Sequence, residues 1–371
     1  MNALPPGRPK AGQPQPGAGK AREPSSPLSS GRGRGEGGLY LAGDLGGTKA
    51  LFGIAEFAGD IPIFTLTRRY ASADFASLEE LLTQFRADAG DALNGVVGAC
   101  LAVAGPVSDD GRQARFTNLP WQADAAALEK VLGSHVTLAN DFAAVAAGIA
   151  VLPAEDRLCL QTGQPRSNGV RLAIGAGTGL GMACIVPTED GFNILPSEGG
   201  HVGYAPADNL QAEFAAFLRD EQERATAERA ISGMGLVSLY RFLVTREAAD
   251  LPDPLASDDP AAAIGTLALS NPQSLARRTV DIFMASYGAF AGDMALALLA
   301  HGGVYLAGGV TQKLLPLLKD GAFMTAFNAK AEHAAIARQI PVHVVTAPEI
   351  GLQGAATLAQ RAFLSSRPLR S

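Results

Sequence analysis

The stretch LYLAGDLGGTKALFGI, residues 39–54, joins two short apolar runs through the turn sequence GDLGGTK. A glycine pair in such a turn supplies the positive φ angles of a hairpin, which is the purely structural interpretation. A second glycine-rich turn, GAGTGLG at residues 175–181, again lies between apolar runs and again carries a threonine. Backbone N–H groups without neighbouring Cβ atoms, with a hydroxyl beside them, can cradle phosphate oxygens. Two such turns therefore predict that both bind one polyphosphate.

The length and composition indicate a globular protein with more than one lobe. A chain of 371 residues exceeds the size at which one hydrophobic core keeps growing. Apolar residues make up 47% and charged residues 18%, and no apolar run is long enough for a membrane span, so no contact with a membrane is expected. The widely spaced Cys100, Cys159 and Cys184 predict buried free thiols and a reducing, cytoplasmic compartment.

The first 38 residues differ from the rest, since they hold seven Pro, nine Gly, six basic and two acidic residues. Such a segment cannot bury enough apolar surface to offset its chain entropy, so residues 1–38 are expected to be a disordered Pro/Gly-rich tail. The remaining chain has 24 basic and 34 acidic residues, a net charge of −10. A body that acidic argues against nucleic acid as a partner.

The apolar periodicity after the tail alternates between strand and helix. Residues 39–71 predict three strands in a meander, and the pattern of residues 77–90 predicts a helix that ends at a glycine. A continuous apolar run at residues 95–107 predicts a buried strand. Residues 135–151 predict another strand, which breaks at Asn140 and Asp141 and continues as a helix.

A similar unit begins near residue 170, where an apolar strand, a glycine turn and a second strand recur. Helices are then expected at residues 209–224, 227–246 and 273–300, and a late buried strand at 302–310. In the longest of these helices, Tyr287, Phe290 and Met294 share one face. The sequence therefore predicts a duplicated α/β fold with a cleft between the copies.

Two common nucleotide motifs are incomplete in this chain. In GAGTGLG the glycines lie two apart, so the third glycine of GxGxxG falls on Leu180 or Met182. No GxxxxGK followed by Ser or Thr is present anywhere. A dinucleotide enzyme and a P-loop enzyme are therefore both disfavoured.

Phosphoryl transfer requires an aligned hydroxyl, neutralisation of the developing charge and a group that accepts one proton. Asp141 stands where strand changes to helix in LANDF, and it is the acid we expect to act as the base. The alternative is that Asp141 only caps the following helix, because Asp and Asn are favoured at N-caps.

Five motifs in order, GDLGGTK, LANDF, GAGTGLG, SEGGH and LAGGV, resemble those of the bacterial glucokinases, and the resemblance covers residues 39–360. It implies the two-lobed actin-like ATPase (ribonuclease H-like) fold, with duplicated mixed-sheet domains and a central cleft. The small domain would comprise residues 39–150 with 346–366, and the large domain residues 151–345. It also implies ATP-dependent phosphorylation of glucose to glucose 6-phosphate, feeding glycolysis.

Sugar recognition needs several carboxylates and amides that span adjacent hydroxyls. Such groups occur in SEGGH and TAERAISG, and the resemblance implies that these segments and the Asn before the catalytic acid bind the sugar. The candidates are Asn140, Asp141, Glu198, His201, Glu228 and, as a weaker one, Asn118. Without the match, Glu228 would be read as a solvated helix residue and His201 as a structural one.

The resemblance also implies the nucleotide site. Its candidates are Gly43, Asp44, Gly46, Gly47 and Thr48 in the first turn, Gly177, Thr178 and Gly179 in the second, and Gly308 on the adenosine side. Asp44 is placed to hold Mg²⁺ through water. Gly308 could equally be an entry turn to a helix.

Three positions differ from the usual pattern of these glucokinases: Lys49, Ser197 and Gly203. After GGHVGYAP no cysteine cluster follows, so no structural zinc is expected. A filament or chaperone ATPase is the alternative class, and it would need the glycine turns but not SEGGH. Mannose or fructose as acceptor, polyphosphate as donor, and a homodimer are left open, whereas regulatory DNA binding is remote.

Overall fold

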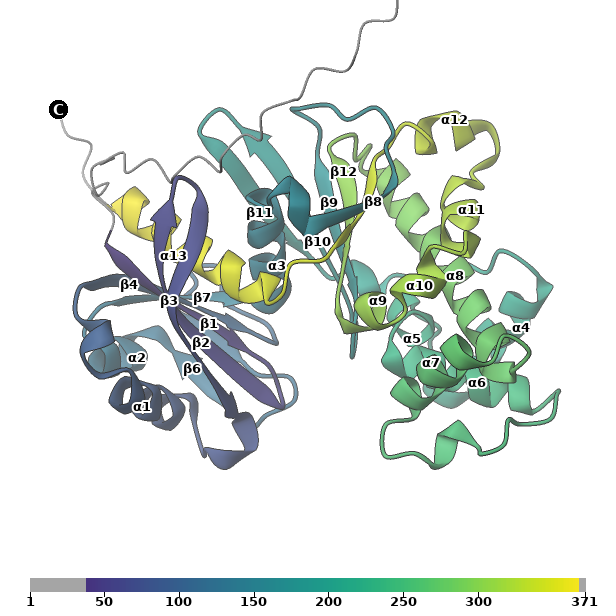
Figure 1. Ribbon diagram of the computed structural model, residues 1–371, viewed down its shortest axis with the longest axis horizontal. Helices are drawn as coiled ribbons and strands as arrows, with labels where there is room; N and C mark the ends of the chain where they lie inside the picture. Colours follow the sequence, from purple (N-terminus) through teal and green to yellow (C-terminus); the bar gives the residue numbers. More distant parts are fainter. Residues whose placement is uncertain (1–37, 367–371) are drawn as a thin grey trace, which may run out of the picture. The chain divides into compact units, whose positions relative to one another are not determined.

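The computed structural model describes residues 38–366, so the predicted tail lies outside the described residues except for Gly38. The described chain belongs to one compact unit with two large β-sheets (Figure 1). None of the helices in this part of the chain combines the length and the apolar character that a membrane span requires.

The first sheet has five strands in the order β3-β2-β1-β4-β7. Their bounds are β1 Leu39–Leu45, β2 Lys49–Ala58, β3 Ile61–Ala71, β4 Val96–Val103 and β7 His135–Asn140. The first three form the predicted antiparallel meander, and β4 pairs in parallel with both β1 and β7. Helices α1 (Leu78–Ala89) and α2 (Ala125–Leu132) pack against this sheet in one buried apolar cluster, beside the small hairpin of β5 (Gln113–Arg115) and β6 (Gln122–Asp124).

The second sheet has six strands in the order β11-β10-β9-β12-β13-β8. Their bounds are β8 Arg157–Gln161, β9 Arg171–Ala176, β10 Leu180–Thr188, β11 Gly191–Ser197, β12 Gly303–Ala307 and β13 Val342–Val345. Strands β9, β10 and β11 are antiparallel neighbours, whereas β12 is parallel to β9 and to β13. The strands β11-β10-β9-β12-β13 repeat the order and directions of the first sheet, and β8 is added antiparallel to β13 at the edge, so the predicted duplication is confirmed.

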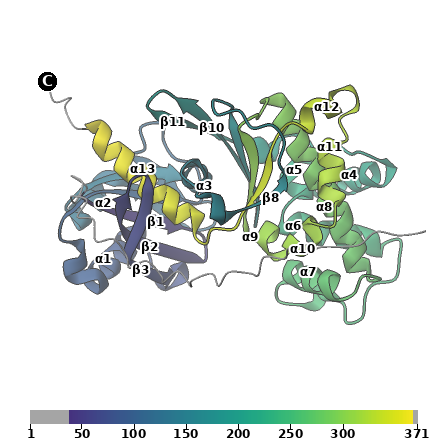
Figure 2. The same cartoon turned by 45° about the horizontal axis from the view of Figure 1, so that its top comes forward.

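Helix α3 (Asp141–Ala150) contributes to the cores of both sheets. Its Ala144 packs with residues of β1, β2 and β4, while Ala146 and Ile149 pack with residues of β9, β10 and β12. The terminal helix α13 (Ile350–Ser366) lies against α3, as both views show (Figure 2). The predicted domain boundaries fall at the end of α3 and between β13 and α13, and the division itself remains a prediction.

The remaining helices cover the second sheet. They are α4 Asn209–Gln222, α5 Ala227–Ala230, α6 Gly233–Val244, α7 Pro260–Ser270, α8 Leu275–Ala297, α9 Gly309–Lys313, α10 Leu315–Leu318, α11 Ala322–Asn328 and α12 Ala334–Ala337. The predicted long helix corresponds to α8, in which Tyr287 and Phe290 are buried and Met294 packs on the same core.

Three predictions about local structure are wrong. The single helix expected at 227–246 is broken, because Ser232 caps a new helix and the N–H of Gly233 donates to the carbonyl of Gly177 over 2.8 Å. The strand expected at 302–310 ends at Ala307, where the chain enters α9. All three cysteines are free, but Cys159 is exposed, because its neighbours Leu158 and Leu160 pack on the core and the side chain between them points to the opposite face of β8.

Candidate functional site

The first glycine turn connects β1 to β2. The N–H of Gly46 donates to the carbonyl of Lys49 over 2.9 Å, and the Ser72 hydroxyl donates to the Gly46 carbonyl over 2.9 Å. A Cβ on Gly47 would lie 2.9 Å from the Cβ of Asn118, so the predicted Asn118 packs directly against this turn. Gly43 lies within β1, and Thr48 is exposed at the turn.

Asp44 is a half-buried carboxylate beside the turn, with no hydrogen-bond or ion-pair partner anywhere in residues 38–366. Burial raises its pKa to about 6, with smaller contributions from the negative charges of Asp141 and Glu349. A Cβ on Gly351 would lie 2.8 Å from the carboxylate, so the start of α13 borders the same site. A carboxylate that lies near two other acids and has no cation partner in the described chain fits Mg²⁺, which takes one or two protein carboxylates and completes its shell with water and phosphate oxygens.

Asn140, and not Asp141, caps helix α3. The side-chain Oδ1 of Asn140 accepts hydrogen bonds from the N–H of Phe142 (2.9 Å) and of Ala143 (3.2 Å). Its Nδ2 donates to the carbonyl of Gly105 over 3.1 Å. The purely capping interpretation of Asp141 is therefore wrong, and one N–H of Asn140 is left for a ligand.

Asp141 is the first residue of α3, and its Oδ1 accepts a hydrogen bond from the N–H of Phe142 over 2.9 Å. Burial raises the pKa of Asp141; the N–H of Phe142 opposes this effect, and the charge of Glu198 adds to it. Because its charge also raises the pKa of Asp44, the two aspartates lie within electrostatic reach of each other. Asp141 therefore lies within electrostatic reach of both Asp44 in the first turn and the sugar candidate Glu198.

The second glycine turn, between β9 and β10, lies against the same helix. A Cβ on Gly175 or on Gly181 would lie 2.5 or 2.3 Å from the ring of Phe142, the residue after Asp141. Inside the turn, the N–H of Gly177 donates to the carbonyl of Gly179 over 2.9 Å. A Cβ on Gly177 would meet no atom within 4 Å, so this backbone faces open space.

Glu228 is tied to the second turn. Its Oε2 accepts a hydrogen bond from the N–H of Leu180 over 2.9 Å, and a Cβ on Gly179 would lie 2.5 Å from the same oxygen. Its side chain is only 23% exposed, so it is not the solvated helix residue that the local sequence alone would suggest. The other carboxylate oxygen, Oε1, faces His201.

His201 connects the two glutamates. Its Nε2 lies 3.7 Å from Oε2 of Glu198, and its Nδ1 lies 3.8 Å from Oε1 of Glu228. A Cβ on Gly200 would lie 2.0 Å from the carbonyl of Leu180, so the glycine pair of SEGGH packs directly on the start of β10. The structure thus brings together the three sugar candidates from SEGGH and TAERAISG.

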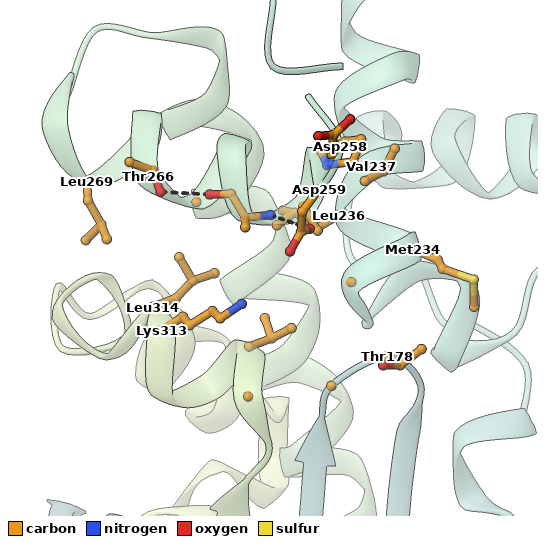
Figure 3. A pocket seen from close by; sticks show the side chains of 18 residues that line it. Thr178, Met234, Leu236, Val237, Asp258, Asp259, Thr266, Leu269, Lys313 and Leu314 are labelled. Carbon is orange, nitrogen blue, oxygen red and sulfur yellow. Dashed lines mark hydrogen bonds between the residues drawn. The ribbon is translucent and has the colours of Figure 1, made fainter. Parts of the chain in front are cut away.

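A cavity of about 770 Å³ adjoins the second turn (Figure 3). Gly177 and Thr178 line it together with residues of α6, α7 and α9, and the side chain of Lys313 extends toward it from α9. The volume is in the range of small-molecule sites and is sufficient for a base and ribose. Lys313, Gly233 and Met234 were not predicted, because their segments are far apart in the sequence.

Gly308 is the N-cap of α9 with φ of +93°, and a Cβ there would lie 2.4 Å from the carbonyl of Ala176. Its helix-entry interpretation is therefore correct. Gly309, the second glycine of the LAGGV turn, lines the cavity, and a Cβ there would have no atom within 4 Å. Within the described chain, no group of three or more His, Cys, Asp or Glu residues is placed to hold a metal ion.

Comparison with known proteins gives concordant matches. A family model described as glucokinase matches residues 41–362. The glucokinase of Nostoc punctiforme is 38% identical over 342 residues, covering 87% of this chain and 99% of that protein. The glucokinase of Yersinia pestis (strain Pestoides F) is 37% identical over 317 residues, covering 85% of this chain and 94% of that protein.

Solved structures agree with these matches. A glucokinase from an Antarctic psychrotroph has a TM-score of 0.75 and 31% identity, covering 87% of this chain and 99% of that chain. A ROK family glucokinase from Streptomyces griseus, solved in complex with glucose and AMPPNP, has a TM-score of 0.61 and 21% identity. It covers 87% of this chain and 100% of that chain, and this second similarity concerns the fold alone.

Proposed function

The chain belongs to the glucokinase family, and on that premise we propose that Asp141 is the base for transfer of the γ-phosphoryl group of ATP to the 6-hydroxyl of glucose. The protein is an ATP-dependent hexose kinase with the predicted actin-like, ribonuclease H-like fold. The observation that supports the residue assignment is the position of Asp141 at the start of α3, whose N-cap is Asn140. Asp141 lies within electrostatic reach of Asp44 and Glu198, and the next residue, Phe142, packs on the strands of the second turn.

Asp141 accepts the hydroxyl proton in this proposal. Its raised pKa makes it a stronger base than an ordinary exposed aspartate. The hydrogen bond from Phe142 fixes Oδ1, and the carboxylate accepts the substrate hydroxyl through its other oxygen. Positioning, and not covalent chemistry, then supplies most of the rate enhancement.

The sugar binds to Glu198, His201 and Glu228, with the remaining N–H of Asn140. The contacts among the first three support their action as one group, because His201 lies between the two carboxylates. Carboxylates accept from sugar hydroxyls, and imidazole can donate or accept. Asn118 positions the first turn through its packing on Gly47 and contacts the sugar less directly.

The two glycine turns bind the phosphates of ATP through Gly46, Gly47 and Thr48 on one side and Gly177, Thr178 and Gly179 on the other. The adenosine occupies the cavity that Gly309 borders. Gly308, the N-cap of α9, sets the direction in which the chain enters that helix. Asp44 would hold Mg²⁺ through water, and the bound metal would neutralise charge on the phosphates. Gly43 contributes through strand packing, since a Cβ there would lie 2.7 Å from Leu101.

The test is ADP release by the native protein and by Asp141→Ala, with glucose, mannose, fructose or no sugar, and with ATP or polyphosphate as donor. We expect glucose- and ATP-dependent turnover that falls by two or more orders of magnitude in the variant, the typical size of a general-base contribution. The exposed Asp109→Ala serves as the control. Full glucose-dependent turnover by Asp141→Ala would remove this residue as the base, and rapid sugar-independent hydrolysis would favour a filament or chaperone ATPase.

We also propose a cytoplasmic location, which the family and the free thiols support. Homodimer formation remains a prediction. Sedimentation of the purified protein over a range of concentrations decides it, since a dimer gives a mass that changes with dilution.

A further inference from the structure

A second cavity, of about 540 Å³, shares no residue with the ATP cavity. It lies where the tip of the β2–β3 hairpin, the carboxyl end of α3 and the first residues of β8 and β9 meet. Three arginines line it: Arg157 on β8, Arg166 in the following loop and Arg171 on β9. Nothing in the proposed kinase mechanism uses these residues.

The three guanidinium groups have no carboxylate partner among residues 38–366. Nη1 of Arg157 donates to the Tyr305 hydroxyl over 3.1 Å, and Nη1 of Arg171 donates to the carbonyl of Ala150 over 3.0 Å. The one acidic residue in the lining, Asp60, is exposed at the hairpin tip and forms no ion pair with them. Three unpaired arginines around one cavity are notable in a body with a net charge of −10.

Two neighbouring histidines respond to this positive charge. Burial and, to a smaller extent, the charge of Arg157 lower the pKa of His343 to about 4. Burial and the charge of Arg166 lower the pKa of His301 in the same way. The arginine charges are therefore not balanced locally, which is the condition under which an anion gains most from binding.

We propose that this arginine cavity binds a small phosphate monoester. Guanidinium groups present paired N–H donors that match phosphate oxygens, and three of them suit a dianion. The buried phenol of Tyr305 adds a hydroxyl hydrogen for which the described chain offers no acceptor. The apolar side chains of Ile149, Val151 and Leu152 line the rest of the cavity and suit the carbon part of such a ligand.

The cavity is connected to the kinase site through α3. Asp141 is the first residue of this helix and Ala150 the last, so these two residues lie about 13.5 Å apart along its axis. Arg171 holds the carbonyl of Ala150, and a bound anion would compete for the same guanidinium group. The ligand therefore contacts the helix that carries the proposed base.

The test is isothermal titration with the kinase site filled by glucose, AMPPNP and Mg²⁺, so that binding there does not contribute. Glycerol 3-phosphate, glucose 6-phosphate and succinate are the probes. We expect one site for the phosphate esters, and affinity at least tenfold weaker in Arg157→Gln and in Arg166→Gln, the lower range for loss of a charged hydrogen bond. Arg219→Gln, at an exposed position on α4, is the matched control.

Arg166 is exposed, so Arg166→Gln should fold normally. This variant therefore keeps the test decisive if Arg157→Gln fails to fold. Binding of glucose 6-phosphate alone supports the proposal and identifies the reaction product as the ligand, whereas binding of both esters supports a general phosphate site. Absence of binding to the native protein, or unchanged affinity in Arg166→Gln, overturns it. Equal, arginine-dependent binding of succinate overturns the choice of phosphate. The kcat for glucose in Arg166→Gln should be unchanged, because Arg166 takes no part in the proposed kinase mechanism. A failure of the phosphate-site proposal can therefore be told apart from a failure of that mechanism.

Discussion

Replacement of Asp44 by Asn is expected to stabilise the protein and to reduce its activity. Burial and the neighbouring acids raise the pKa of Asp44 from 3.8 to about 6. A carboxyl whose pKa is raised in the folded state opposes folding when it is ionised, so the cost is fully present above pH 6 and disappears as the pH falls from 6 through 3.8. About two pKa units, at 1.36 kcal/mol each, give a cost of about 3 kcal/mol.

The assay is thermal unfolding of the native protein and Asp44→Asn between about pH 4 and pH 8, without nucleotide or metal. At about 2 °C per kcal/mol for a chain of this size, the variant should unfold roughly 6 °C higher at neutral pH, and the difference should shrink on acidification. The exposed Asp109→Asn should show no such difference. Equal unfolding temperatures at neutral pH, or a gap that persists in acid, would refute the burial argument. Turnover with Mg²⁺ and ATP should fall in Asp44→Asn but not in the control.

Gly308→Ala should destabilise the protein by about 1–3 kcal/mol, because the φ of Gly308 is positive and an added Cβ would clash with a carbonyl oxygen. Gly309→Ala should keep the stability and raise the KM for ATP. Chemical denaturation and kinetics measure these effects, and equal losses of stability in the two variants would contradict the assignment. Glu228→Gln keeps an acceptor for the N–H of Leu180 and should raise mainly the KM for glucose. Glu228→Ala leaves that N–H unpaired and should also lower the stability by about 1–3 kcal/mol. Identical unfolding curves for these two variants would show that the hydrogen bond to Leu180 does not stabilise the fold. The hydrogen bond from Arg112 lowers the pKa of Glu129 to about 2, so its stabilising effect is present above about pH 4.5 and is lost as the pH falls toward 2. Arg112→Leu should therefore reduce stability near neutral pH and flatten the acid side of the stability profile, and an unchanged profile would argue against this contribution.

Residue patterning predicted the elements whose causes are local. The meander, α1 and α8 follow from apolar spacing, and the first turn follows from its glycine pair. The break before α6 could not be predicted, because it depends on a hydrogen bond from Gly233 to Gly177, which is 56 residues earlier in the chain. The short strands β8 and β13 were missed since four or five residues give little periodicity.

The candidate site shows the same division. The residue types in LANDF did not reveal which of Asn140 and Asp141 caps α3, because both are good caps and only the side-chain geometry distinguishes them. Glu228 looked solvated in its own helix, and its bond to Leu180 exists only in the folded chain. Lys313 and the other residues of the ATP cavity come from segments that no single motif joins.

The ring of Phe142 fills the space that side chains at Gly175 and Gly181 would need. Phe142, which follows the proposed base Asp141 in α3, therefore also limits the size of the side chains that the second glycine turn can carry at positions 175 and 181. An engineer who enlarges either glycine to admit a different phosphate donor must shrink position 142 at the same time, and would thereby shift Asp141. Donor choice and proton abstraction in this enzyme cannot be redesigned independently of each other.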